Sequence, residues 1–292
     1  MLISQHTKVL SKKFGVENAV KMLAAAGFTA VDISMFDKWD PPFLDNSGEV
    51  IKKLNKLKKE LGIIYNQAHA PVGTYEEYME KVIPSLPSVI AAAGELEIKN
   101  LVVHPIMKGY YYDNAKEMFD INIDFYASLI PYARAAGVKI AIENMWERHR
   151  VTDRIIDNIA ADPRELSLIY DTLNTPDVFT VCLDIGHTAL CGREPEDAVR
   201  IIGGDRLGAL HVHDVDYKED WHTLPGIGNI NWDRVARALA DVDYKGDLTL
   251  EAYGFYKNFE DDFLPEALKF MAIRTQYLAD KIETYKVENG KK

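Results

Sequence analysis

The stretch "GVKIAIEN" (residues 137–144) contains the unit from which the fold can be worked out. It follows a segment with apolar residues at helical spacing (115–136), and its glycine stands where a left-handed helix cap belongs. A short β-branched run then ends in Glu143 and Asn144. This order of helix, glycine, buried strand and polar strand end is typical of a parallel sheet whose strands are connected by helices.

The same unit recurs along the chain. Strands are predicted at 1–5, 30–36, 62–70, 100–105, 138–145, 178–187, 207–216 and 247–254. Helices are predicted at 16–26, 50–61, 75–94, 115–136, 195–202, 232–241 and 263–285, and the segment 151–173 carries an extra loop before its helix. Left-handed caps are expected at Gly27, Gly62, Gly94 and Gly137.

Eight such units, with no linker or composition break between them, predict an α/β fold in the form of a (β/α)8 TIM barrel. We expect residues 1–292 to form a single domain of this kind. The competing fold is an open doubly wound sheet, which usually has a glycine-rich phosphate turn after its first strand. The segment "SQHTKVLSKKFG" (4–15) offers no such turn, so the barrel is favoured.

The composition limits the kinds of binding partner and the cellular location that are expected. The 34 Lys and Arg residues are outnumbered by 45 Asp and Glu, which gives a net charge of −11 and argues against binding to nucleic acid or anionic membranes. No run reaches the ~20 apolar residues needed to span a bilayer. The first residues lack the apolar core of a signal peptide, so a cytoplasmic protein is expected. Cys182 and Cys191 are expected to be small buried apolar residues rather than a disulfide framework.

Six of the predicted strands end in side chains that suit a metal ion. These side chains are His69, His104, Glu143, Asp184 with His187, His211 and Glu251. A single histidine at a strand end is more often scaffolding, and Asp184 alone could cap a helix. In a barrel, however, all six positions converge on the rim where active sites lie. So many carboxylates and imidazoles at one mouth are costly unless a cation lies between them, so a divalent metal site is predicted.

Several motifs give the chain a resemblance to a known family. They are "IEN" (143), "LDIGH" (183–187), "HVHD" (211–214), "DWHTLPGIGNINW" (220–232) and "LEAY" (250–253). In this order the chain resembles, over nearly its whole length, the xylose-isomerase-like TIM barrel superfamily. That superfamily contains sugar epimerases and isomerases, inosose dehydratases and endonuclease IV, an AP endonuclease of family 2.

The resemblance implies a set of roles. One divalent cation (Mn, Mg, Co or Zn) would be held by Glu143, Asp184, His211 and Glu251. Glu143 and Glu251 would also be the catalytic acid–base pair for proton abstraction next to a carbonyl, through a metal-stabilised enediolate. Substrate-binding roles are assigned to His187, His69 and His104. Trp39 and Trp146, which follow predicted strands, are added because aromatic faces stack on the C–H faces of sugars. The implied protein is a sugar isomerase or epimerase, acting on a ketose or polyol. No membrane or nucleic-acid partner is expected, and a homo-oligomer is possible.

A second reading follows from the endonuclease branch of the same superfamily. Up to three zinc ions would be bound there, with additional ligands at His69, His104, His187, Asp220 and His222, for phosphodiester hydrolysis in abasic DNA. The rim loops are net acidic, which argues against a polyanionic substrate. The loop after His211 has only Lys218 where ketose epimerases often have an arginine, so a keto-inositol dehydratase and a non-catalytic sugar-binding barrel stay open. We rank the sugar enzyme first.

Overall fold

The computed structural model describes residues 1–35, 43 and 47–291 of the chain. Its main sheet has eight parallel strands, in the order β10-β1-β2-β3-β4-β5-β8-β9. They are β1 (Ile3–His6), β2 (Ala30–Ser34), β3 (Ile64–His69), β4 (Asn100–Val103), β5 (Lys139–Glu143), β8 (Phe179–Asp184), β9 (Leu207–His211) and β10 (Leu248–Leu250). A parallel bridge between Val212 and Leu250 joins the two ends of the sheet. The predicted (β/α)8 TIM barrel is therefore confirmed.

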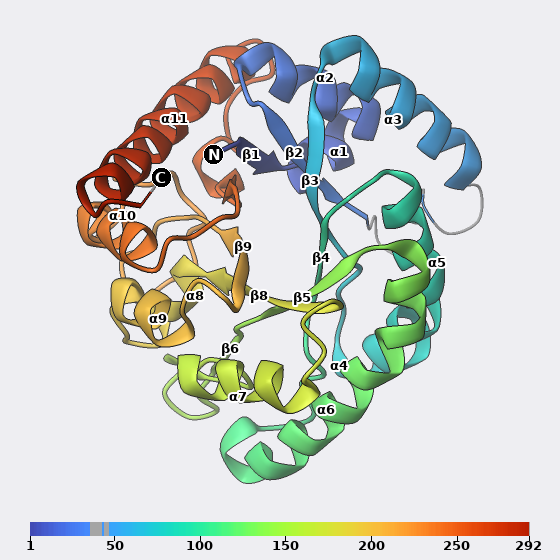
Figure 1. Ribbon diagram of the computed structural model, residues 1–292, viewed down its shortest axis with the longest axis vertical. Coiled ribbons are helices and arrows are strands. Elements are labelled where there is room, and N and C mark those ends of the chain that lie inside the picture. Colours follow the sequence, from blue (N-terminus) through green and yellow to red (C-terminus); the bar gives the residue numbers. More distant parts are fainter. Residues whose placement is uncertain (36–42, 44–46, 292) are drawn as a thin grey trace.

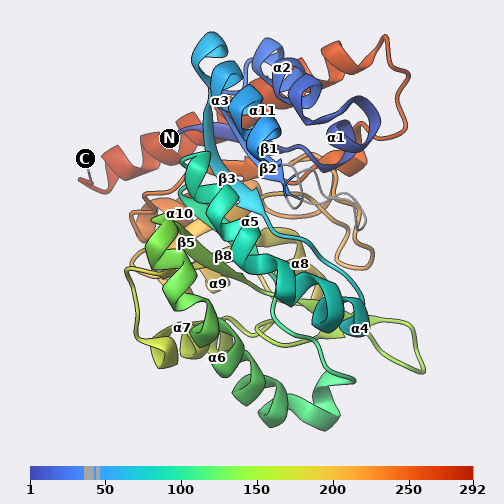
Figure 2. The same ribbon diagram turned by 90° about the vertical axis from the view of Figure 1, so that its right-hand side faces the viewer.

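Helices surround the sheet, as Figure 1 shows in the view down the barrel. The long outer helices are α2 (Val16–Ala26), α3 (Ser47–Leu61), α5 (Ile83–Glu95), α6 (Tyr111–Ala136), α7 (Pro163–Leu173), α9 (Pro195–Ile202), α10 (Trp232–Asp241) and α11 (Leu264–Glu288). Shorter helices are α1 (Lys8–Phe14), α4 (Tyr75–Glu77) and α8 (Ile185–Leu190). Helix α11 packs against α2 and α10, which brings the two ends of the chain together, and α5 packs against α6 on the outside of the barrel (Figure 2). Among the described helices, none has the length and apolar character to cross a membrane.

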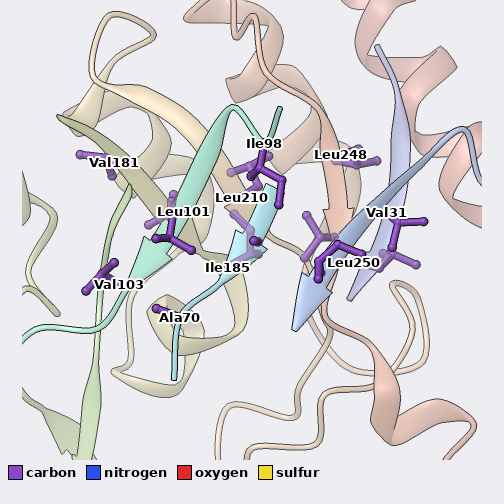
Figure 3. Close-up of a cluster of buried hydrophobic side chains, with 14 of the residues drawn as sticks. Val31, Ala70, Ile98, Leu101, Val103, Val181, Ile185, Leu210, Leu248 and Leu250 are labelled. Carbon is purple, nitrogen blue, oxygen red and sulfur yellow. The ribbon is translucent and has the colours of Figure 1, made fainter. Parts of the chain in front are cut away.

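Strand alternation divides the core into two clusters. Leu101, Val103 and Val181, which Figure 3 labels, belong to the large cluster. This cluster also includes residues of the outer helices. Val102, Ala141, Cys182 and Ala209 form a small separate cluster. Since neighbouring side chains on a strand point to opposite faces, Val102 lies on the opposite face of β4 from Leu101 and Val103. The expectation of a buried apolar cysteine is confirmed for Cys182, whereas Cys191 is only partly buried.

One predicted helix is interrupted in the structure. The predicted helix 75–94 is divided into α4, a π-helical turn (Tyr78–Val82) and α5. Pro84 and Pro87 lie just beyond that turn, and neither can donate a backbone hydrogen bond to a regular helix. Gly94 does not form the predicted left-handed cap, because it lies inside α5 with an ordinary φ. A Cβ atom there would be 2.7 Å from the carbonyl oxygen of Ala136, so this glycine permits the close approach of α5 and α6.

The predicted strand 178–187 is too long by three residues. Strand β8 ends at Asp184, whose carboxylate accepts a hydrogen bond from the backbone N–H of His187 at 2.7 Å and so begins helix α8. His187 therefore lies on a helix and not on the strand. The extra loop expected before the helix of 151–173 is present, because β6 (Trp146–Arg148) and β7 (Ile155–Asp157) form an antiparallel hairpin ahead of α7.

Candidate active site

Four predicted ligands meet at the carboxyl ends of the strands. Glu143, Asp184 and His211 end β5, β8 and β9, and Glu251 follows β10. Each side chain offers a ligand atom within 4.8 Å of those of the other three. The Nδ1 atom of His211 lies 2.8 Å from Glu143 Oε1, 3.4 Å from Glu251 Oε2 and 4.0 Å from Asp184 Oδ2. All four residues are at most 5% exposed.

The charges in this set depend on one another. Burial raises the pKa of Glu143, but His211 and His104 outweigh it and hold the pKa well below its usual value. The pKa of Glu251 is likewise lowered against the effect of burial, by His211 and His222. Burial disfavours the charged form of His211, yet the surrounding acidic groups raise its pKa. Three carboxylates in one buried cluster therefore attract positive charge, which is the condition for binding a divalent cation.

Asp184 is held by contacts from two directions. Besides capping α8, its Oδ1 atom lies 3.0 Å from Nε2 of His213. The His213 ring packs directly on the backbone of Gly186, where an added Cβ would be 2.0 Å from the ring. Asn144 accepts a hydrogen bond from the backbone N–H of Asp184 at 2.7 Å. The motifs "LDIGH" and "IEN" supply the carboxylates of Asp184 and Glu143. They also supply the backbone N–H of His187 and the side chain of Asn144, which orient Asp184.

A second group of donors adjoins the first. It consists of His187, His213, Asp220 and His222, again with ligand atoms within 4.8 Å of one another. His222 Nε2 lies 3.1 Å from Asp220 Oδ2, and the rings of His213 and His222 stack with centroids 4.0 Å apart. Burial raises the pKa of Asp220, but His222 and its neighbours outweigh it and lower the pKa overall. His213 is absent from the predicted ligands, although its spacing of two from His211 places both on one face of an extended strand.

The two remaining predicted histidines lie on the other side of Glu143. His104 Nε2 is 3.0 Å and His69 Nε2 is 3.6 Å from Glu143 Oε2. His69, Glu143 and His211 form a third group of possible donors. The three sets include every predicted ligand except His104, and two of the sets share Glu143 and His211.

Asp214 fixes the loop that carries Asp220 and His222. This carboxylate is fully buried and accepts four hydrogen bonds. Oδ1 accepts from the backbone N–H groups of Val215 (2.9 Å) and Ile230 (3.1 Å). Oδ2 accepts from the backbone N–H of Gly226 (2.7 Å) and from Nε1 of Trp232 (2.8 Å). Both ends of the loop are therefore bound to one side chain.

The variant Asp214→Asn is expected to lower the free energy of unfolding by about 2 to 3 kcal/mol, because an amide nitrogen would face two N–H donors. Urea denaturation measures the change. Asp216→Asn is the matched control, since Asp216 Oδ1 accepts only from the exposed backbone N–H groups of Lys218 and Glu219. Equal stability losses in the two variants would show that Asp214 does not fix the loop.

A pocket of about 300 Å³ opens above these donors. Its lining residues are Lys8, His69, Val72, His104, Met107, Glu143, Met145, Trp146, His187, Asp220, His222, Glu251 and Tyr253. The predicted substrate-binding residue Trp146 lies in this lining, with its ring edge-on to His187. Trp39 lies outside the described residues. Tyr253 stacks on His222 with ring centroids 4.4 Å apart.

Positive charge is scarce around this pocket. Lys8 is the one lysine or arginine among the described lining residues, and its ammonium lies 5.4 Å from the ring centre of Tyr253. Two nearby arginines pair with carboxylates. Arg148 Nη2 lies 2.7 Å from Glu219 Oε2, and Arg193 Nη2 lies 2.7 Å from Asp157 Oδ2. The pocket therefore suits a small polar molecule better than a polyanion.

Comparison with known proteins agrees with this architecture. An L-ribulose 3-epimerase from a Methylomonas species is 25% identical over 253 residues, which cover 82% of this chain and 79% of that protein. An uncharacterized protein of Methanocaldococcus jannaschii is 27% identical and covers 92% of this chain and 90% of its own length. A probable endonuclease 4 from Halorhodospira halophila is 34% identical over 97 residues, only 28% of this chain and 33% of that protein.

A solved structure described as a D-tagatose 3-epimerase-like protein shares the fold with a TM-score of 0.75, at 21% identity and with 99% of both chains covered. The relationship to a sugar epimerase along most of the chain rests on the L-ribulose 3-epimerase, which covers 82% of it. The family model described as "Xylose isomerase-like TIM barrel" matches residues 20–274. With the barrel and the ligand-bearing strand ends in place, this match shows that the chain belongs to the xylose isomerase-like TIM barrel family.

Proposed function

We propose that the protein is a divalent-cation-dependent sugar isomerase or epimerase that acts on a ketose or polyol. The observation that carries the proposal is the buried set of Glu143, Asp184, His211 and Glu251, with ligand atoms within 4.8 Å of one another. Mixed carboxylate and imidazole donors suit Mn²⁺, Mg²⁺, Co²⁺ or Zn²⁺. A cation bound there would polarise a carbonyl and lower the pKa of the adjacent C–H group.

The side chains supply the proton transfer. Glu143 and Glu251 come from strands separated by β8 and β9, and His211 Nδ1 lies between their carboxylates. Because their pKa values are lowered, both are ionised at neutral pH and can accept a proton. One glutamate would remove the proton next to the substrate carbonyl, and the other would return a proton to the opposite face.

The pocket walls would orient the substrate. His187 and His104 present ring nitrogens that can bond to sugar hydroxyl groups, and Trp146 offers an aromatic wall. The related L-ribulose 3-epimerase supports epimerisation as the reaction. A pocket of about 300 Å³ is at the lower end of small-molecule sites and suits a single sugar.

The second candidate is a zinc-dependent phosphodiesterase acting on abasic DNA. The observation that favours it is the second donor group, His187, His213, Asp220 and His222, beside the first. The partial relationship to a probable endonuclease 4 points the same way. The scarcity of cations argues against it, because Lys8 is the one lysine or arginine among the described lining residues of the pocket. We therefore rank this activity second.

One experiment separates the candidates. The protein, loaded in turn with Mn²⁺, Co²⁺ and Zn²⁺, is incubated with a panel of ketoses and keto-inositols in D₂O and, separately, with an abasic-site duplex. Deuterium incorporation next to the carbonyl together with a new epimer, seen by NMR, is the expected result. Loss of water from a keto-inositol would indicate a dehydratase, and strand cleavage without deuterium incorporation would indicate the nuclease. Sugar binding without exchange would indicate a non-catalytic barrel.

A further inference from the structure

Asp32 is a buried carboxylate that none of the roles above uses. It lies on β2, is completely inaccessible to solvent, and does not line the pocket. Its Oδ2 atom accepts a hydrogen bond from Nε2 of Gln67 at 3.0 Å, whereas Oδ1 has no hydrogen-bond partner within the described part of the chain. A carboxylate is costly to bury in this way, so its retention at this position calls for a specific partner.

That partner is the Nε2 atom of His211. The two ring nitrogens of this histidine face different groups. Nδ1 points into the four-residue set, 2.8 Å from Glu143 Oε1, and Nε2 lies 3.5 Å from Asp32 Oδ2 and has no hydrogen-bond partner among the described residues. A neutral imidazole that binds a cation through Nδ1 must carry its proton on Nε2. Metal-binding histidines typically donate this second N–H to a carboxylate or a carbonyl.

We propose that Asp32 is a positioning residue for the cation site, acting through His211. With a cation at Nδ1, Asp32 would accept the Nε2–H group, select the tautomer whose Nδ1 lone pair is free, and increase the basicity of that nitrogen. Gln67 extends this support, because its amide contacts Asp32 and lies 3.5 Å from the carbonyl oxygen of Leu210, the residue before His211. The inference rests on the proposed function, since it requires a cation at Nδ1.

The test is cation affinity of the full-length chain. Metal-free protein is titrated with Co²⁺ against a chelator of known affinity, and the visible absorption of bound Co²⁺ is recorded. The variant Asp32→Asn keeps the shape and removes the charge. We expect it to bind Co²⁺ roughly 10- to 100-fold more weakly, with an altered Co²⁺ spectrum. A purely structural residue would change thermal unfolding of the metal-free chain but not this affinity.

Two further variants make the result interpretable. Ser4→Ala is the matched control, since Ser4 is buried on the next strand, bonds to Thr249 Oγ1 at 2.9 Å and has no contact with His211 in the structure; it should bind Co²⁺ like the wild type. Gln67→Met removes the hydrogen bond to Asp32 and should weaken binding in the same direction. If Asp32→Asn fails to fold, the Co²⁺ affinity of Gln67→Met tests the positioning role in its place.

The outcomes separate this inference from the proposed function. If the wild type binds no Co²⁺, the proposed cation site is wrong. If the wild type binds Co²⁺ and Asp32→Asn binds it with unchanged affinity and spectrum, Asp32 does not position His211, while the proposed function stands. Weakened binding in Asp32→Asn with wild-type binding in Ser4→Ala supports the positioning role.

Discussion

Replacing either Glu143 or Glu251 with glutamine is expected to slow epimerisation by roughly a thousandfold, because an amide cannot accept a proton from carbon. The two variants should differ in a second measurement. If each glutamate serves one face of the substrate, Glu143→Gln stops deuterium exchange from one epimer and Glu251→Gln stops it from the other. Proton NMR of both epimers in D₂O measures the exchange and the epimerisation in the same samples.

Controls are needed because both glutamates also belong to the candidate cation set. Metal content is measured for each variant, so that loss of the cation is distinguished from loss of the base. Glu147→Gln is the matched control, since Glu147 is a partly buried glutamate whose Oε1 accepts a hydrogen bond from the backbone N–H of Tyr111 and which does not line the pocket. Near wild-type epimerisation in a fully loaded Glu143→Gln or Glu251→Gln variant would rule out that residue as an acid–base group.

The barrel could be predicted because its signal is repeated. Each strand is an apolar run, and each connection has helical periodicity, so eight weak local patterns support one architecture. Boundaries decided by single contacts were not predictable in the same way. The strand predicted at 178–187 continues apolar past Asp184, and only the hydrogen bond from the His187 backbone to this carboxylate ends it. Strands β6 and β7 have three residues each, too few for any periodicity.

The same distinction holds for the site. The ligand-type residues at strand ends could be found because the barrel brings those ends together. His213 was not among the predicted ligands and Asp32 was not among the predicted site residues. Contacts between side chains of different strands, such as those of His213 with Asp184 and of Asp32 with Gln67, cannot be seen in a sequence. The sequence nevertheless contains a sign of Asp32, because this residue places a charge inside the apolar strand "AVDIS" (30–34). In the structure that charge is buried. Buried charges inside a predicted strand are therefore worth testing as supports of a metal ligand.

Removal of divalent cations is expected to abolish turnover, because Lys8, imidazole, indole and hydroxyl groups are the other donors that the described pocket residues offer to a carbonyl. Dialysis against EDTA, followed by titration with Mn²⁺, tests this. Turnover should return fully at about one equivalent per chain. The cation should also stabilise the fold by about 2.7 kcal/mol at a free concentration of 100 times its Kd, measured as a rise in Tm.

The number of metal ions bound per chain distinguishes the two candidate activities. His222→Gln removes a donor from the second group and leaves Glu143, Asp184, His211 and Glu251 intact. For a sugar epimerase with one cation, this variant should bind one equivalent, as the wild type does. For a phosphodiesterase with a cluster of zinc ions, the wild type should bind about three equivalents and His222→Gln should lose at least one. Full turnover in the metal-free wild type would contradict both proposals, since each assigns to a cation the stabilisation of the developing negative charge.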